Sequence, residues 1–264
     1  MLKADIKELM VTGKGALLSG ISFELKNNRI HTILGLNGSG KTTLIKSLTG
    51  LLNKRIYSVE GSVNLEGMDL LSLNSTEILP IRKNKIKYVF QDAVNSFNHL
   101  KTFEYYFKNI AKEKEEINEL LSYFLLPLYS ELSRLFPYEV SGGMAQRISF
   151  ILALLSHPEI IILDEPTSGI DSAISNLFLF KLKEFVSRRS NSALLVTHDI
   201  NFAEKISDEI AFLSEGKLSN FFPKNEMFSS SDFVPDIISG IDADEKSNTD
   251  LLKKLIYSYK QLSL

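Results

Sequence analysis

The chain has 264 residues, of which 44% are hydrophobic and 23% charged, an ordinary balance for a globular protein. Its formal net charge of −2 excludes the strong basic bias of proteins that bind nucleic acid through charge, so we expect no nucleic-acid partner. The absence of cysteine excludes disulfides, thiol catalysis and metal centres built on thiolates.

Apolar and alternating segments in the first ninety residues predict strands joined by one helix. Residues 41–52 have helical spacing, which places Leu44, Ile45 and Leu48 on one face. The strands are predicted at residues 21–26, 29–36, 61–65 and 86–90.

Farther along, residues 103–136 are free of glycine and predict two or three helices. IIILD (160–164) and ALLVT (193–197) are short apolar runs typical of buried parallel strands, and residues 176–186 predict a helix between them. This alternation predicts a parallel α/β sheet interrupted by a helical insert.

The sequence GLNGSGKT fits the pattern G-x-x-x-x-G-K-[ST] and lies between a predicted strand and a predicted helix. Such a loop turns backbone N–H groups towards phosphate, and the helix adds its positive N-terminus. We expect Lys41 to neutralise phosphate oxygens and Thr42 to ligate Mg²⁺. The predicted phosphate-binding residues are Gly35, Leu36, Asn37, Gly38, Ser39, Gly40, Lys41, Thr42 and Thr43.

Four polar side chains follow predicted strands, at the sheet edge where α/β proteins bind ligands. Asp164 could hold Mg²⁺ through water, and Glu165 could polarise an attacking water. His198 could hydrogen-bond a γ-phosphate, whereas Gln91 could coordinate Mg²⁺ and water through a neutral oxygen. The alternative is that these residues are polar strand ends without a catalytic role.

EVSGGMAQR (139–147) forms a second glycine turn that opens a predicted helix, with Ser141 as its N-cap. The turn lacks a lysine, and the sheet already has a phosphate loop. The simplest geometry is therefore that it contacts the nucleotide of another subunit. The expected apolar face is Met144, Ile148, Ile151, Leu152 and Leu155, and the expected polar face is Gln146 and Arg147.

VSGGMAQR resembles the signature motif of ABC-type ATPases. Phosphate loop, Gln91, signature, IIILDEP, SGID and His198 follow that family's order over about residues 5–220. The resemblance implies a P-loop NTPase with a RecA-like parallel core, an antiparallel β subdomain and an inserted α-helical subdomain. The implied segments are 1–91 and 151–224 for the core, 92–150 for the helical subdomain and 225–264 for a tail.

The same resemblance implies a head-to-tail dimer that holds two ATP molecules with Mg²⁺. Glu165, His198 and Gln91 would act at the ATP of their own subunit. Ser141, Gly142 and Gly143 would contact the partner's ATP, and Asp171 would lie at the dimer seam.

Residues 67–86 and 88–100, with YEVSGGMAQR, are most similar to ATPases of oligopeptide, dipeptide and nickel importers. This similarity implies a peripheral protein on the cytoplasmic side of the cell membrane. Its partners would be a second ATPase, two transmembrane permease subunits and an extracytoplasmic solute-binding protein. The alternatives are the ATPase of a peptide or antibiotic exporter, a non-transport ABC ATPase and a regulatory ATP-binding module.

One departure from the family concerns the residue that holds adenine. Residues 7–20 hold no aromatic side chain to stack on adenine, as the family usually has near Thr12 or Gly13, and Phe23 has the position of a core strand residue.

The tail ends in an amphipathic segment, 251–262, which would dock on the body or contact a partner. No apolar stretch reaches the roughly 18 residues of a membrane span, and the segment after Met1 is too polar for a signal peptide, so we expect any membrane role to come through a partner.

Overall fold

The computed structural model describes residues 1–110, 113–188 and 190–229. Its strands are β1 (Leu2–Val11), β2 (Gly15–Leu25), β3 (Ile30–Leu34), β4 (Tyr57–Leu65), β5 (Met68–Asp69), β6 (Ile86–Val89), β7 (Ile160–Asp164), β8 (Ser192–Thr197), β9 (Glu209–Ser214), β10 (Lys217–Leu218) and β11 (Phe222–Pro223). Its helices are α1 (Lys41–Leu48), α2 (Ser75–Asn84), α3 (Ala93–Ser96), α4 (Phe103–Lys108), α5 (Lys114–Tyr123), α6 (Tyr129–Leu132), the 3₁₀ helix η1 (Pro137–Glu139), α7 (Gly142–Leu155), α8 (Ser172–Ser187), α9 (Ile200–Ile206) and α10 (Lys224–Ser229).

The strands form two sheets. An antiparallel sheet has the order β2-β1-β4-β5, and a second sheet has the order β10-β9-β3-β8-β7-β6, with β11 also paired to β9. In the second sheet β9, β3, β8, β7 and β6 run parallel to one another. Their carboxyl ends therefore meet at one edge, where a parallel sheet presents its ligand site.

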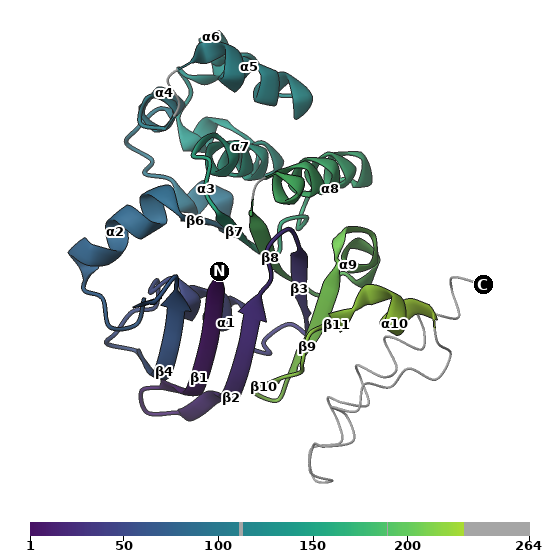
Figure 1. Ribbon diagram of the computed structural model, residues 1–264. Helices are drawn as coiled ribbons and strands as arrows, with labels where there is room; N and C mark the ends of the chain where they lie inside the picture. Colours follow the sequence, from purple (N-terminus) through teal and green to yellow (C-terminus); the bar gives the residue numbers. More distant parts are fainter. Residues whose placement is uncertain (111–112, 189, 230–264) are drawn as a thin grey trace.

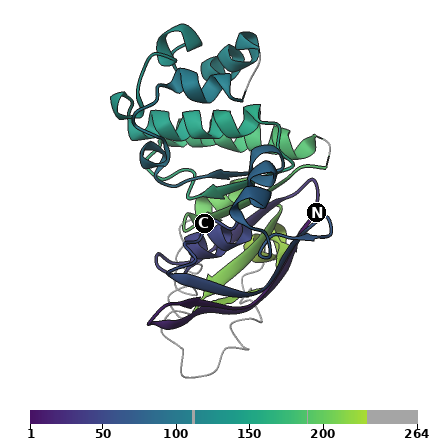
Figure 2. The same cartoon turned by 90° about the vertical axis from the view of Figure 1, so that its left-hand side faces the viewer.

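Alternation along the central strands gives the parallel sheet two apolar faces. Ile160 and Ile162 belong to the core shared with α1 and the antiparallel sheet. Ile161 and Leu163 belong to the core shared with α7 and α8. Because both faces are covered, the strand reads as one continuous apolar run. In Figures 1 and 2 the antiparallel sheet lies at one end of the molecule, and α5 and α6 lie at the other.

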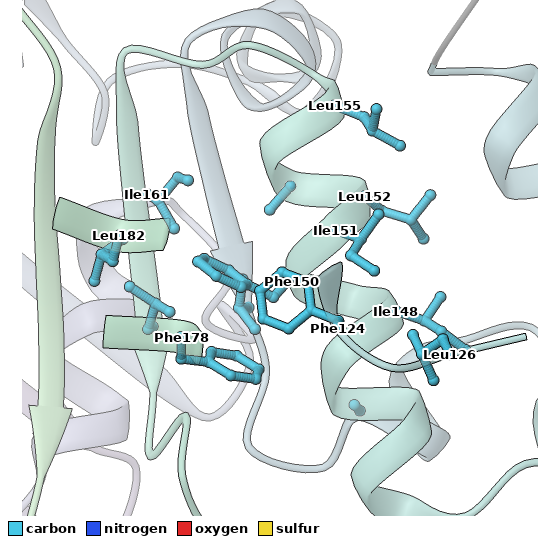
Figure 3. Packing of buried hydrophobic residues seen from close by; sticks show 14 of the residues in the cluster. Phe124, Leu126, Ile148, Phe150, Ile151, Leu152, Leu155, Ile161, Phe178 and Leu182 are labelled. Carbon is cyan, nitrogen blue, oxygen red and sulfur yellow. The ribbon is translucent and has the colours of Figure 1, made fainter. Parts of the chain in front are cut away.

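An aromatic cluster joins the helical insert to the sheet-covering helices. Phe150 on α7 stacks on Phe178 of α8, with ring centroids 4.7 Å apart. Phe124, which caps the C-terminus of α5, makes T-shaped contacts with both rings. Its ring centroid is 5.8 Å from that of Phe150 and 5.3 Å from that of Phe178. Figure 3 shows these rings beside α7. Such pairs add roughly 0.5–1.5 kcal/mol each beyond area burial, so the insert is held firmly near α7.

The predicted fold class is confirmed: a parallel α/β core carries an antiparallel sheet and an inserted group of helices. The segment boundaries stay a prediction. The predicted helix at 41–52 is too long, because α1 ends at Leu48 and Gly50 adopts a left-handed φ of 63°. Most of the tail, including 251–262, lies outside the described residues.

Candidate nucleotide-binding site

The phosphate loop connects β3 to α1, as the motif predicts. Gly40 is the N-cap of α1 with φ 97°, and no side chain caps the first backbone N–H groups of the helix. A Cβ at Gly35 would lie 2.6 Å from the Leu213 carbonyl oxygen, so only glycine fits there. The loop therefore presents uncapped donors at a positive helix end.

Lys41 lies inside this loop. Its Nζ donates to the carbonyl oxygens of Gly35 at 2.9 Å and Leu36 at 3.0 Å, and its side chain is only 6% exposed. Nζ is also 3.4 Å from Glu165 Oε1. A buried ammonium group held by loop carbonyls and one carboxylate is well placed to bind phosphate oxygens.

Asp164 ends β7 and is buried, with 2% of its surface exposed. The Thr42 hydroxyl donates to Oδ1 at 2.9 Å, and the Tyr88 hydroxyl donates to Oδ2 at 2.8 Å. Burial raises the pKa of Asp164 above its usual value, and these two hydrogen bonds oppose the rise. The structure thus brings together Thr42 and Asp164, two of the three oxygen donors predicted for Mg²⁺.

Glu165 follows directly and adopts a left-handed φ of 45°, which is uncommon for a residue with a side chain. Its Oε2 accepts the Thr197 hydroxyl at 3.0 Å and lies 3.0 Å from His198 Nδ1. Its amide donates to the Val196 carbonyl at 3.0 Å. These contacts from the end of β8 hold the carboxylate in one orientation beside Lys41.

The two remaining predicted site residues differ in their contacts. His198 joins the cluster through Glu165 and keeps 53% of its side chain exposed, so its ring can still reach a ligand. Gln91 follows β6 and is exposed. Within the described residues no hydrogen bond links its side chain to the phosphate loop or to the two carboxylates.

The second glycine turn opens α7 as predicted. The Ser141 hydroxyl caps the helix by accepting from the Met144 amide at 3.2 Å, and both Ser141 and Gly142 are exposed. A Cβ on Gly143 would lie 3.4 Å from Ile170, so the turn packs beside the segment that leads to Asp171. Asp171 is itself the N-cap of α8, accepting from the Ile174 amide at 2.9 Å.

Gln146 corrects the predicted helix faces. It was expected on a polar face but is 3% exposed, because α7 is covered on nearly all sides. Arg147 is half-buried instead of solvent-facing. It donates to the Gly143 carbonyl at 3.0 Å and to the Phe124 carbonyl at 2.8 Å, which ties the turn to the helical insert.

These residues fit a magnesium nucleotide. Ser39 Oγ is buried in the loop without a hydrogen-bond partner, which is an unused donor where phosphate would lie. A hydroxyl and a carboxylate are hard oxygen ligands of the kind that Mg²⁺ prefers. In the described part of the chain no cluster of three or more His, Asp or Glu converges on one point. Mg²⁺ is usually bound by one or two carboxylates, with substrate phosphates and water as its other ligands.

Two site residues were missed by sequence reasoning. Tyr88 lies inside β6 and Thr197 ends β8, and both donate to the buried carboxylates. Thr197 could have been found as the last residue of a predicted strand next to His198. Tyr88 could have been found only from the register between β6 and β7.

The fold and these contacts define a P-loop nucleotide-binding protein. Residues 18–168 match the family model described as "ABC transporter". Because that match covers more than half of the chain, the chain belongs to the ABC transporter family.

Two relatives and one solved structure agree with this family membership. The chain is 29% identical over 238 residues to the oligopeptide transport ATP-binding protein AmiE of Streptococcus pneumoniae, covering 86% of this chain and 66% of AmiE. It is 30% identical over 219 residues to the dipeptide transport ATP-binding protein DppD of Bacillus subtilis, covering 79% and 65%. The ATP-binding cassette MJ0796, bound to ADP and Pi as a dimer, has a TM-score of 0.72 at 25% identity, covering 85% and 99%.

The predicted similarity to peptide-importer ATPases is thereby confirmed. The chain spans about two thirds of the length of the curated relatives it matches. Within the described ranges, no helix has the length and apolar character needed to cross a membrane.

Proposed function

We propose that this chain binds and hydrolyses ATP to drive a membrane transporter. The single observation that carries the proposal is the cluster of Lys41, Asp164 and Glu165 at the carboxyl edge of the parallel sheet, with Lys41 Nζ 3.4 Å from Glu165. The loop lysine can bind phosphate, and the buried aspartate at the strand end can bind the metal. The adjacent glutamate can accept a proton.

In this proposal each side chain has one task. Lys41 binds phosphate oxygens, and Thr42 with Asp164 holds Mg²⁺, which would neutralise charge on the phosphates. Glu165, fixed by Thr197 and His198, orients the attacking water and accepts its proton. Gln91, although exposed, would complete the metal site, and His198 would contact the γ-phosphate.

The exposed signature turn supports a composite site. Ser141 and Gly142 are accessible at the start of α7, and among the described residues no hydrogen bond joins 141–143 to the loop at 35–43. We infer that Ser141, Gly142 and Gly143 contact ATP held by the partner in a head-to-tail dimer, with Asp171 at the seam. Each dimer would enclose two ATP molecules.

The names of two relatives support a proposal for the substrate class. AmiE is named as an oligopeptide transport protein and DppD as a dipeptide transport protein. We propose that this chain powers import of peptides or nickel-like metal complexes, from the cytoplasmic face of the membrane. It would work with a second ATPase, two permease subunits and a solute-binding protein.

The substitution Glu165→Gln tests the proposed hydrolysis. Glutamine keeps the shape of the side chain but cannot accept the proton, so hydrolysis should fall by about 100-fold or more while ATP binding persists. Because ATP is then not consumed, the variant should accumulate as an ATP-bound dimer in analytical ultracentrifugation. The matched control is Glu159→Gln, which removes an exposed carboxylate that pairs with Lys85. Wild-type turnover in the Glu165 variant would overturn the proposal.

The substrate class needs the assembled transporter. ATP hydrolysis by the complex in liposomes should rise when a solute-binding protein loaded with peptide is added, and radiolabelled peptide should enter. Stimulation by a nickel chelate but not by peptide would support import of metal complexes instead of peptides. Outward movement of a peptide without any binding protein would support the alternative that the chain is the ATPase of an exporter.

A further inference from the structure

Asp164 is held from two sides by two different elements. Thr42, in the first turn of α1, donates to Oδ1, whereas Tyr88, on β6, donates to Oδ2. The carboxylate is 2% exposed, so these hydroxyl groups replace the water that would otherwise solvate it. Of the two, only Thr42 belongs to the phosphate-loop motif.

The sheet register places Tyr88 at this point. β6 and β7 are parallel, and Tyr88 is paired with Ile162, two residues before Asp164. Residues two apart share a face of the sheet, so Tyr88, Ile162 and Asp164 all face α1. The Tyr88 ring also contacts the Phe90 ring, with centroids 4.5 Å apart, immediately before Gln91. The long side chain therefore reaches along the strand to the carboxylate.

A phenol hydroxyl has one proton to donate, and Tyr88 gives it to Oδ2. Oδ1 then remains turned towards Thr42, which is also a predicted metal-binding side chain. Without this hydrogen bond the carboxylate could rotate about its terminal torsion, which is soft in aspartate.

We propose that Tyr88 is a positioning residue that fixes Asp164 with Oδ1 facing Thr42, and that it thereby sets the Mg²⁺ affinity of the nucleotide-bound site. This inference rests on the proposed function, because it assumes that Mg²⁺ binds with ATP. Groups that orient metal ligands typically change metal affinity about 10- to 100-fold when they are removed.

The test is Tyr88→Phe in the full chain, with binding of trinitrophenyl-ATP measured by fluorescence. Mg²⁺ is titrated at fixed nucleotide, and a parallel sample contains EDTA. The variant should need about 10- to 100-fold more Mg²⁺ for half-maximal enhancement of binding. Binding in EDTA should stay at the wild-type level, because Lys41 and the loop are unchanged. An unchanged Mg²⁺ midpoint would overturn the inference.

Two control variants separate a positioning role of Tyr88 from a general loss of structure. Tyr123→Phe removes a hydroxyl on α5 that donates to the Leu177 carbonyl and makes no hydrogen bond to Asp164. This variant should leave the Mg²⁺ midpoint unchanged. Phe90→Leu disturbs the neighbouring ring but keeps both hydrogen bonds to Asp164. If it shifts the midpoint as much as Tyr88→Phe, packing is responsible and the inference fails.

A double-mutant cycle gives the sharpest comparison. In an Asp164→Asn background, Tyr88→Phe should cause no further shift, because Tyr88 acts through that carboxylate. An additive shift would contradict the inference. If wild-type protein shows no Mg²⁺-dependent nucleotide binding, the proposed function fails first. If the wild type shows it and the Tyr88 variant matches, only the positioning role fails.

Discussion

His31 is a fully buried histidine in β3, away from the phosphate loop. Its Nε2 accepts a hydrogen bond from the Lys26 amide at 3.1 Å, so a proton on that nitrogen would break the bond. The pKa of His31 is lowered to about 4, chiefly by burial and to a lesser extent by nearby Lys26, against the opposing effect of Glu209 and Asp208. The imidazole is therefore neutral in the folded protein at pH 7.

This buried imidazole predicts a loss of stability in mild acid. The unfolded chain binds the proton near pH 6.5, whereas the folded chain binds it only near pH 4. The free energy of unfolding should therefore fall as pH drops below about 6.5, by about 2 kcal/mol between pH 7.5 and pH 5 from this residue alone. Urea unfolding followed by circular dichroism measures the change.

Two variants isolate the contribution. His31→Gln removes the titrating group, so its unfolding free energy should depend less steeply on pH than that of the wild type. His157→Gln removes a histidine whose side chain is 68% exposed and should keep the wild-type dependence. Equal dependence in the wild type and the His31 variant would show that the buried imidazole is not responsible.

At the scale of elements, the turn between β1 and β2 lacks an aromatic ring for adenine. Thr12 is exposed there, and its hydroxyl donates to the Ile56 carbonyl at 3.1 Å. Phe23 cannot serve instead, because it is 7% exposed and meets the edge of Phe221, with ring centroids 5.7 Å apart. The prediction that Phe23 occupies a core position agrees with this burial.

We expect Thr12→Tyr to strengthen ATP binding. One base stacked on an aromatic ring contributes about 1–3 kcal/mol, so the dissociation constant should fall about tenfold. Competition of ATP against trinitrophenyl-ATP measures it, and Lys101→Tyr, which adds a tyrosine in the helical insert, is the control. Unchanged affinity in the Thr12 variant would mean that another group already holds the base.

The elements also show which features the sequence can predict. The phosphate loop, Asp164, Glu165 and His198 are local patterns at strand ends, and parallel strands bring such ends together without further information. The N-cap of α7 is equally local, because Ser141 reaches an amide only three residues away.

Contacts between distant segments were not predictable in this way. The Tyr88–Asp164 bond depends on the β6–β7 register, which joins residues 76 positions apart. α1 ends early where Arg82 donates to the carbonyls of Thr49 and Gly50, more than thirty positions away. Gln146 is buried because neighbouring helices and strands cover α7, and helical periodicity within one segment cannot reveal that cover.

At the scale of the whole molecule, the proposed dimer would use the two glycine turns as separate halves of each ATP site. The loop at 35–43 meets Asp164 and Glu165, whereas Gly143 packs beside Gly169 and Ile170. A symmetric head-to-tail dimer would repeat each half twice and form two complete sites. In such a dimer one subunit alone would bind ATP but would lack the second half of the site, which hydrolysis needs.

Mixing two inactive variants tests that geometry. Lys41→Ala removes the phosphate-binding cation, and Ser141→Arg fills the signature turn, so each should abolish hydrolysis in a dimer of this chain. In a mixed dimer, the intact turn of the Lys41 variant faces the intact loop of the Ser141 variant. Half of the dimers in an equal mixture are mixed and each holds one complete site, so about one quarter of wild-type hydrolysis should return.

A second mixture tests whether recovery of hydrolysis requires an intact signature turn from the partner. An equal mixture of Lys41→Ala and Glu165→Gln should stay inactive, because both lesions lie on the loop half and every site in the mixed dimer carries one of them. Steady-state phosphate release measures both mixtures at protein concentrations that favour the dimer. Recovery in both mixtures, or in neither, would contradict the composite site, because a turn that acts on its own loop cannot be complemented by a partner.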